Sequence, residues 1–437
     1  MPKVLIINQP FNTNTGGGIT LSNLFSKWDR EKLAVACSGY LLTKDMDPTV
    51  CNNYYQLGSE ERKWMFPFHL FRRKYYSGEV KFTNTSKEII VENKSKFRVK
   101  LLVKHLYPVL DFLGFSHFMT QTHLSKGFCS WIDEFDPEVL YTQASSLEDI
   151  LFCLEVKEYT GKPLIFHMMD DWPATLERNG LLANYWRDKT DGMLRVLLAN
   201  TAVAMSISDY MAAEYKRRYG KEFVTFHNPI DLRFWEKDQR KNYQLKVSPT
   251  ILYAGRIGLG IDDSLKIIAS AVHTINKKFN SKLRFVIQSL DAPSWITDYE
   301  DVEHQKFVPY QELPKIFSDT DFLILPYDFD EESIKFIKYS MPTKASEYMA
   351  SGTPIIIFSP EDTALVQYAK EYGWASMVTD SQVSSLSETI FSLLYDEDLR
   401  KNIATIAKHL AETRHDASIV SGNFQRCISD VVPRNKN

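Results

Sequence analysis

One stretch of the chain, residues 341–358, has the sequence MPTKASEYMASGTPIIIF. Its pattern predicts a short helix capped by Thr343 and closed by Gly352 in the left-handed conformation. A wholly apolar run after Pro354 then indicates a buried strand. A helix that leads into such a strand is typical of a parallel sheet with helices on both faces, so the stretch predicts an α/β fold.

The rest of the chain repeats this alternation, for example in the apolar runs 4–7, 139–142 and 250–254. We expect two Rossmann-like, doubly wound domains that face each other across a cleft. The predicted divisions are a first domain at 1–235 with a basic and aromatic insertion at about 59–113, a linker at 236–248, a second domain at 249–416 and a helix at 417–437 that packs back on the first domain.

Composition adds few constraints. The net charge is −3, and the five cysteines include no CxxC pair, which favours reduced thiols in a cytosolic protein. The N-terminus does not resemble a signal peptide, and no run approaches 18 apolar residues. We therefore predict a cytoplasmic location, peripheral to the inner face of a membrane at most.

The segment 60–105 is the one strongly basic region, with twelve Lys/Arg against five Glu. Interleaved aromatic residues suit an anionic bilayer surface, which we assign to residues 62–105. A solvated helix face above core aromatics explains the same pattern equally well. Nucleic acid is a weaker alternative because no recognition motif accompanies the charge.

Three features predict a phosphate site. Lys344 and Glu347 lie three residues apart at the start of the predicted helix, where backbone N–H groups lack helical partners. Arg256 follows the strand at 250–254 within a glycine-rich turn, and Gly17 and Gly18 follow the first strand. Ordinary surface ion pairs and a plain flexible turn are the structural alternatives.

A predicted buried strand that begins at Pro163 ends in polar residues, among them His167, Asp170 and Asp171. Its carboxyl end is where an open α/β sheet binds ligands, so these side chains are candidates for substrate contacts. A buried core histidine is the alternative.

The motif P-T-K-x-x-E-Y-M-A-x-G-T-P-I-I resembles the nucleotide-binding segment of retaining glycosyltransferases of the GT-B fold, family 4. The resemblance implies transfer of a sugar from a nucleotide-sugar to a hydroxyl of a glycan or lipid-linked acceptor, with retention, in cell-surface polysaccharide biosynthesis. The first domain would bind the acceptor and the second the nucleotide-sugar. The resemblance implies no metal and no cofactor, since the nucleotide-sugar is a substrate.

The resemblance also assigns roles to individual residues. The catalytic candidates are His167, Arg256 and Lys344. The donor-binding candidates are Gly17, Gly18, Arg256, Lys344, Glu347 and Tyr348. Further sugar or acceptor contacts are expected from Asp170, Asp171, Asn228, Tyr327 and Tyr339.

Two positions depart from the family pattern. Ile261 stands where the family has the lysine that pairs with the arginine, and Tyr339 stands where it has a glutamate. We expect Lys344 to supply the second cation. The departures also leave open a non-catalytic binding subunit of the same fold, or a nucleotide-sugar epimerase.

A three-residue D-x-D match, Asp328-Phe329-Asp330, is interpreted as a solvated loop tip rather than a metal site. The sequence does not identify the sugar, the base, the acceptor, the linkage or the oligomeric state.

Overall fold

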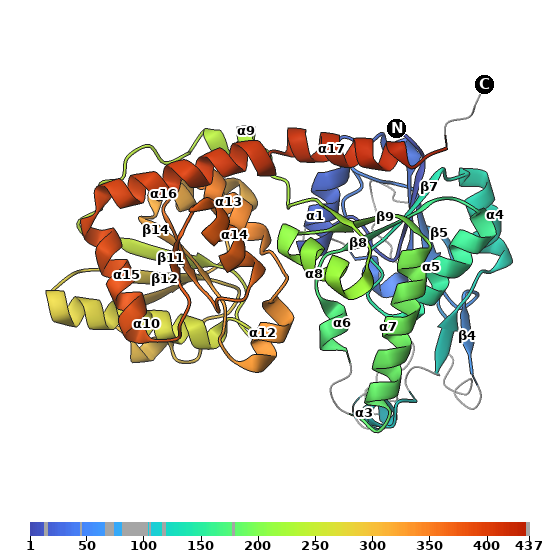
Figure 1. Cartoon of the computed structure of the whole chain (residues 1–437), viewed down its shortest axis with the longest axis horizontal. Helices are drawn as coiled ribbons and strands as arrows, with labels where there is room; N and C mark the ends of the chain where they lie inside the picture. The colour runs from blue at the N-terminus through green and yellow to red at the C-terminus, as the bar shows by residue number, and fades with distance from the viewer. Residues whose placement is uncertain are drawn as a thin grey trace. The chain divides into compact units, whose positions relative to one another are not determined.

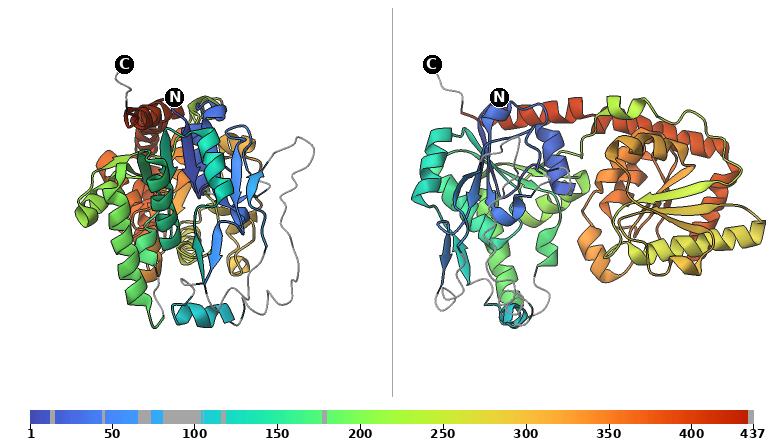
Figure 2. Two further views of the ribbon diagram at one scale, coloured as in Figure 1. Left: turned by 90° about the vertical axis from the view of Figure 1, so that its right-hand side faces the viewer. Right: turned by 180° about the vertical axis from the view of Figure 1, so that it is seen from behind.

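The structure is a computed structural model that describes residues 1–12, 16–43, 46–65, 74–80, 104, 106–115, 119–176 and 180–433. The chain forms two compact units, drawn in Figures 1 and 2. Unit 1 comprises Met1–Ile207, Ala212–Phe226 and Ser421–Asn437, and unit 2 comprises Ser208–Met211 and His227–Val420.

Unit 1 is built on an eight-stranded sheet of order β10-β9-β8-β7-β1-β2-β3-β5. Its pairs are parallel except β3 with β5. The strands are β1 (Val4–Ile7), β2 (Leu33–Ser38), β3 (Tyr54–Leu57), β5 (Gly78–Val80), β7 (Val139–Thr142), β8 (Leu164–Met168), β9 (Thr201–Ser206) and β10 (Phe223–Thr225). A separate antiparallel ribbon joins β4 (Arg62–Trp64) to β6 (Thr120–Thr122).

Unit 1 has helices around this sheet (Figure 1). They are α1 (Gly16–Phe25), α3 (Tyr107–Phe112), α4 (Lys126–Phe135), α5 (Leu147–Thr160), α6 (Trp172–Thr175), α7 (Ala183–Ala199) and α8 (Asp209–Tyr219), whose first residues belong to unit 2, and part of α17 (Ala417–Asp430). Phe424 of α17 packs on Phe25 and Tyr141, with ring centroids 5.0 and 6.0 Å away.

Unit 2 is built on a wholly parallel six-stranded sheet of order β13-β12-β11-β14-β15-β16. The strands are β11 (Thr250–Ala254), β12 (Arg284–Gln288), β13 (Val302–Gln305), β14 (Phe322–Pro326), β15 (Ile355–Phe358) and β16 (Ser376–Val378). The α-helices are α9 (Leu232–Glu236), α10 (Asp262–Phe279), α11 (Leu313–Asp319), α12 (Glu331–Ile337), α13 (Thr343–Ser351), α14 (Ala364–Tyr372), α15 (Val383–Tyr395) and α16 (Glu397–Leu410). Two α/β Rossmann-like domains are thus confirmed.

The predicted caps of α13 are half correct. Gly352 closes the helix in the left-handed conformation, with φ of 73°. Thr343, however, is already helical, and Pro342 occupies the N-cap position without a side-chain hydrogen bond to the helix. No side chain therefore caps the N-terminal backbone N–H groups of α13. Such N–H groups can donate to a bound anion.

The predicted glycine-rich turn is also wrong, because the glycines from Gly16 to Gly18 form the first turn of α1. A Cβ on Gly18 would lie 2.2 Å from Asn12 Nδ2, so the close approach of Asn12 explains a glycine there.

The divisions of the structure differ from the predicted domain limits. Residues 227–235 lie in unit 2, and the chain from Ser421 lies in unit 1. Contacts within unit 2 explain the first difference, since Trp235 stacks on Phe317 and the segment at Ile230 forms a bridge with Asp416.

Most of the basic segment 62–105 falls outside the described residues, and the structure therefore does not test the bilayer contact assigned to it. Within the described part of the chain, no helix has the combination of length and apolar character needed to cross a bilayer.

Candidate functional site

The sheet of unit 2 has a topological switch point between β11 and β14. From β11 the chain order runs outward to β12 and β13, and from β14 it runs outward in the other direction. Ligands of open α/β sheets bind at the carboxyl ends of strands beside such a point. β11 ends at Ala254, so Gly255 and Arg256 emerge at this place.

Lys344 comes to the same place from α13. A Cβ on Gly255 would lie 2.4 Å from Lys344 Nζ, so the ammonium group fits only because residue 255 has no side chain. Lys344 Nζ also lies 5.6 Å from the centroid of the Tyr253 ring, and the Tyr253 hydroxyl donates to the Arg256 carbonyl at 2.5 Å.

Arg256 is exposed, and its Nη1 donates to the Leu259 carbonyl at 3.0 Å. Its guanidinium lies 5.7 Å from the centroid of the Phe336 ring. Burial lowers the pKa of Lys344, and the positive charge of Arg256 adds to this effect. Two cations, Arg256 and Lys344, therefore come from different segments to the end of β11. Their charges are not fully balanced by anionic side chains, as a diphosphate site requires.

Glu347 lies beside Lys344. Burial raises its pKa, while the ammonium of Lys344 and a hydrogen bond from the Tyr310 hydroxyl oppose the rise. Tyr310 stacks on Phe234 with ring centroids 5.2 Å apart. A carboxylate next to an aromatic pair can accept hydrogen bonds from sugar hydroxyls. No pattern in the sequence singled out Tyr310 or Phe234.

Tyr348 has no exposed surface, and its hydroxyl accepts the Ala254 backbone N–H at 3.1 Å. This contact joins α13 to the end of β11. The geometry therefore gives Tyr348 a positioning role, and its direct contact with the donor stays a prediction.

Ile261 is buried at the N-cap position of α10 and cannot supply a cation. Neither Asp262 nor Asp263 caps α10, because both lie inside the helix, and Asp328 accepts the Ser264 N–H at 2.7 Å.

The same contact corrects the interpretation of Asp328 as part of a solvated tip, since Asp328 is 4% exposed. Asp330 caps α12 through the Glu332 and Ser333 N–H groups. Among the described residues, one group of side chains, at His273, Glu300 and Asp301, has potential metal-ligand atoms within 4.8 Å of one another, and it includes neither Asp328 nor Asp330.

In unit 1, β8 places His167 in the core, with 1% of its surface exposed. The Tyr141 hydroxyl hydrogen-bonds to His167 Nδ1 at 2.7 Å and accepts from Gln143 Nε2 at 3.1 Å. The Tyr141 hydrogen is therefore available to Nδ1. Burial lowers the pKa of His167 to about 3, so the ring is neutral.

Gln143 was missed by the sequence analysis. Its Oε1 lies 3.8 Å from the position of a Cβ on Gly17, and Gln9 Nε2 lies 3.6 Å from the same position. A hydrogen-bonded series therefore runs from His167 through Tyr141 to the Gln143 amide, which lies beside Gly17. The polar residue directly after the buried strand β7 is the signal that could have identified it.

The two aspartates after β8 differ. Asp170 is exposed, whereas Asp171 is 2% exposed and accepts from Arg218 Nη1 and Nη2 at 2.9 and 3.0 Å and from the Tyr215 hydroxyl at 2.6 Å. Asp171 is thus fully engaged within unit 1, which favours a structural role over the predicted sugar contact.

The remaining candidates are buried in unit 2. Asn228 Nδ2 lies 3.5 Å from the Met341 carbonyl, just before α13. Tyr327 is 8% exposed, and its carbonyl accepts from the Ser264 hydroxyl. Tyr339 stacks on Tyr210 with ring centroids 5.4 Å apart. Their predicted sugar contacts stay predictions.

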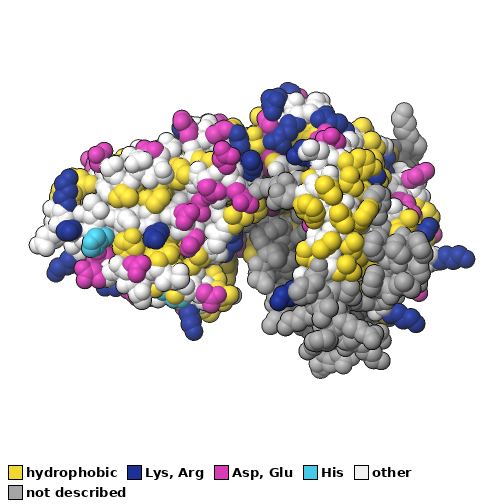
Figure 3. Space-filling view, turned by 90° about the horizontal axis from the view of Figure 1, so that it is seen from below, with side chains coloured by type: hydrophobic (Ala, Val, Ile, Leu, Met, Phe, Trp, Pro, Cys, Tyr) yellow, Lys and Arg dark blue, Asp and Glu magenta, His cyan; other side chains and the backbone are white. Residues whose placement is uncertain are grey.

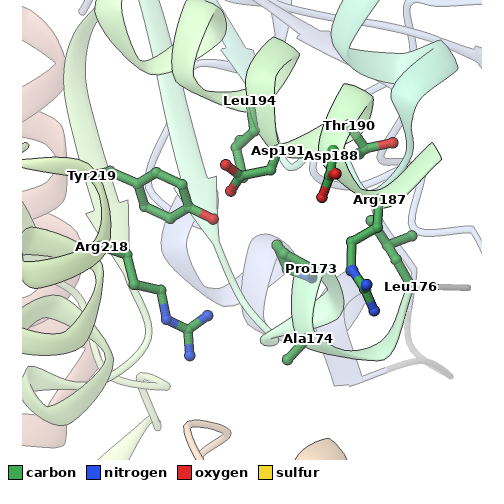
Figure 4. Close-up of a pocket in the computed structure, with 10 residues that line it drawn as sticks. All are labelled: Pro173, Ala174, Leu176, Arg187, Asp188, Thr190, Asp191, Leu194, Arg218 and Tyr219. Carbon is green, nitrogen blue, oxygen red and sulfur yellow. The ribbon is translucent and has the colours of Figure 1, made fainter. Parts of the chain in front are cut away.

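A pocket of about 270 Å³ lies between α6, α7 and α8 and contains none of the predicted site residues (Figure 4). The Tyr219 hydroxyl and the Asp191 carboxylate point toward each other there. Asp191 also pairs with Arg195, and Arg218 pairs with Asp171. Two charged groups of this pocket, Asp191 and Arg218, are thus paired with residues that do not line it.

Residues 248–396 match the family model described as glycosyl transferases group 1. No curated protein matches the chain in sequence. Among solved structures, Anabaena HepE in complex with UDP and glucose has a TM-score of 0.58 at 11% identity, covering 98% of this chain and 100% of that chain.

Two further structures are similar over the whole length. Sucrose-phosphate synthase from Thermosynechococcus elongatus has a TM-score of 0.61 at 10% identity, covering 99% of both chains. WaaG, a glycosyltransferase involved in lipopolysaccharide biosynthesis, has a TM-score of 0.56 at 11% identity, covering 99% of this chain and 100% of that chain. The chain therefore has the two-domain fold of GT-B glycosyltransferases, and its residues 248–396 match the group 1 glycosyl transferase model.

Proposed function

We propose that the protein is a retaining glycosyltransferase that transfers a sugar from a nucleotide-sugar to a hydroxyl of a glycan or lipid-linked acceptor without a metal. The observation that carries this proposal is the convergence of Arg256 and Lys344 at the switch point of unit 2. The match over residues 248–396 supports it, as do the structures of HepE with UDP and with UDP-glucose.

In this proposal Arg256, Lys344 and the uncapped N–H groups of α13 stabilise the negative charge that develops on the leaving diphosphate. Glu347 accepts hydrogen bonds from the ribose, and His167 orients the transferred sugar. The bond from the anomeric carbon to the diphosphate oxygen breaks as the acceptor oxygen bonds to that carbon on the same face. The acceptor proton passes to the released diphosphate, so no side chain needs to act as nucleophile.

The acceptor belongs to unit 1 in this proposal, and the setting is cell-surface polysaccharide biosynthesis at the cytoplasmic face of a membrane. The structural neighbour WaaG is a glycosyltransferase involved in lipopolysaccharide biosynthesis, which supports this setting.

The first test is a thermal-shift screen with UDP, GDP, ADP and their common sugar conjugates, because a ligand that binds only the folded state raises the melting temperature. Nucleotides of one base should raise the melting temperature of the protein, and Arg256→Ala should abolish this increase. Arg284→Ala is the matched control, since Arg284 is a half-exposed arginine at the opposite end of the strands and pairs with Glu303. No shift with any nucleotide would contradict the proposal.

Turnover separates the alternatives on the same fold. A transferase releases nucleoside diphosphate from the stabilising donor faster when acceptor glycans are added. An epimerase converts the nucleotide-sugar without an acceptor, and a non-catalytic subunit binds the donor but leaves it unchanged.

A further inference from the structure

Unit 1 carries an exposed apolar surface made by two segments. We call it the apolar tip, and its members are Leu106, Tyr107, Val109, Phe112, Phe115, Leu181 and Tyr185, all more than a third exposed. In Figure 1, α3 lies beside the first turns of α7. Figure 3 shows hydrophobic side chains gathered on this underside of unit 1.

The two segments of the tip are held together by backbone contacts. The Leu181 N–H donates to the Phe112 carbonyl at 2.8 Å, and Trp186 Nε1 donates to the Gly114 carbonyl at 2.9 Å. A Cβ on Gly180 would lie 2.9 Å from the Phe112 carbonyl oxygen, so this approach requires glycine. The apolar side chains of the two segments therefore form one continuous surface rather than two separate exposed patches.

The tip gains little stability from the core of unit 1. α3 has only six residues, none of them is buried, and no side chain caps its start. A helix this short is unstable in water unless packing supports it, and a contiguous exposed apolar patch of this kind marks an interaction surface.

The surrounding charge favours one occupant. Lys104, Arg187 and Lys189 are exposed next to the tip, and Lys189 Nζ lies 5.0 Å from the Trp186 ring and 5.8 Å from the Tyr185 ring. Asp111 and Asp188 are the acidic groups of these segments. Aromatic and aliphatic groups bordered by cations fit the interface of an anionic bilayer.

We propose that the apolar tip inserts into the headgroup region of an anionic membrane and holds the protein there. The tip residues enter the acyl boundary, and Lys104, Arg187 and Lys189 contact lipid phosphates. This inference rests on the proposed function only in giving the enzyme access to a lipid-linked acceptor, because the binding itself needs no sugar chemistry.

The test is flotation of the full-length protein with vesicles of phosphatidylcholine alone or with about one-third phosphatidylglycerol, at low and high salt. The wild type should float with the anionic vesicles, and Phe112→Ser/Leu181→Ser should reduce the bound fraction at least fivefold. Val247→Ser/Tyr395→Ser is the matched control, because these side chains are 91% and 70% exposed, comparable with the 70% of Leu181, but lie in unit 2.

A second variant tests the charge. Lys104→Gln/Arg187→Gln/Lys189→Gln should weaken binding and reduce its salt dependence. Equal flotation of the wild type and the tip variant, or no flotation of the wild type, would overturn the proposal. Concentration-dependent dimerisation lost in the tip variant, without vesicle binding, would instead assign the tip to self-association. Nucleotide thermal shifts are measured without vesicles, so failure of the proposed function is seen separately.

Discussion

The carboxyl edges of the two sheets differ in electrostatic character. In unit 2, Lys344 interacts electrostatically with both Glu347 and Arg256, and burial lowers the pKa of Lys344 and raises that of Glu347. In unit 1, Asp171 is neutralised by Arg218, and His167 is uncharged. The difference suggests that one edge is prepared for an anion, whereas the other offers neutral hydrogen-bonding groups around the glycines of α1.

The largest expected effect concerns unit 1. Asp171→Ala leaves Arg218 and Tyr215 without their shared buried acceptor, so the free energy of unfolding of unit 1 should fall by about 3 kcal/mol. Urea unfolding followed in unit 1 measures this, and nucleotide affinity should stay unchanged. Asp191→Ala, which breaks a surface pair with Arg195, should cost about 1 kcal/mol or less. If Asp171→Ala kept its stability but lost nucleotide binding, the contrast between the two sheet edges would be wrong.

The next effect is a pH dependence in unit 1. Unfolded histidine takes up a proton below pH 6.5, whereas folded His167 stays neutral down to about pH 3. The unfolded state therefore binds more protons in this range. The contribution of His167 to the free energy of unfolding is fully present above pH 6.5, and it falls by about 1.4 kcal/mol per pH unit below that value.

Between pH 6.5 and 5 the loss from His167 is thus about 2 kcal/mol. His167→Asn should remove this part of the slope in urea unfolding, while His273→Asn, on the surface of unit 2, should not. Identical slopes for the wild type and His167→Asn would mean that the folded ring can be protonated, and that the edge of unit 1 is not neutral.

In unit 2, Lys344→Met keeps the length of the side chain but removes the charge. The dissociation constant of the nucleoside diphosphate should rise more than tenfold, or at least about 1.4 kcal/mol, by isothermal titration calorimetry. Lys370→Met is the control, because Lys370 forms a surface pair with Glu361. An unchanged dissociation constant would exclude Lys344 as the second phosphate cation.

The smallest effect is expected from Gly255→Ala. The new methyl group would lie 2.4 Å from both Lys344 Nζ and the Tyr253 hydroxyl, so both side chains must shift, and affinity should fall about fivefold, or about 1 kcal/mol. Gly422→Ala, where the added methyl group meets nothing within 4 Å, should have no such effect. Combined with Lys344→Met, the Gly255 change should add little, since both act on the same ammonium group. If the effects of the two changes on affinity were fully additive, Gly255→Ala would not act through the contact with Lys344 Nζ.

The sequence predicted the elements that depend on local pattern. Continuous apolar runs identified β1 and β15, and Gly352 marked the end of α13. The N-cap of α13 was predicted incorrectly, and that of α10 was not identified, because N-capping depends on backbone conformation and on distant partners. Asp328, which accepts the Ser264 N–H, lies 64 residues along the chain from it.

The candidate site divides in the same way. Lys344 and Arg256 were identified because phosphate chemistry restricts both residue type and position at strand and helix ends. The sequence left open whether His167 is a buried core histidine or a substrate contact, because its burial involves Phe424 of the last helix, whose ring centroid lies 6.4 Å from that of His167. Gln143 and Tyr310 were missed because their relevance depends on which side chains the folded chain brings beside Gly17 and Glu347.

The hydrogen bond from Ala254 N–H to Tyr348 has a consequence for binding thermodynamics. It fixes α13 to the end of β11, and the close fit of Lys344 against Gly255 restricts the rotamers of the lysine before any ligand arrives. A diphosphate would therefore meet two cations carried by segments, the end of β11 and α13, that are already joined to each other. Most of the ordering entropy of this site is lost during folding, so binding should show a small unfavourable conformational entropy.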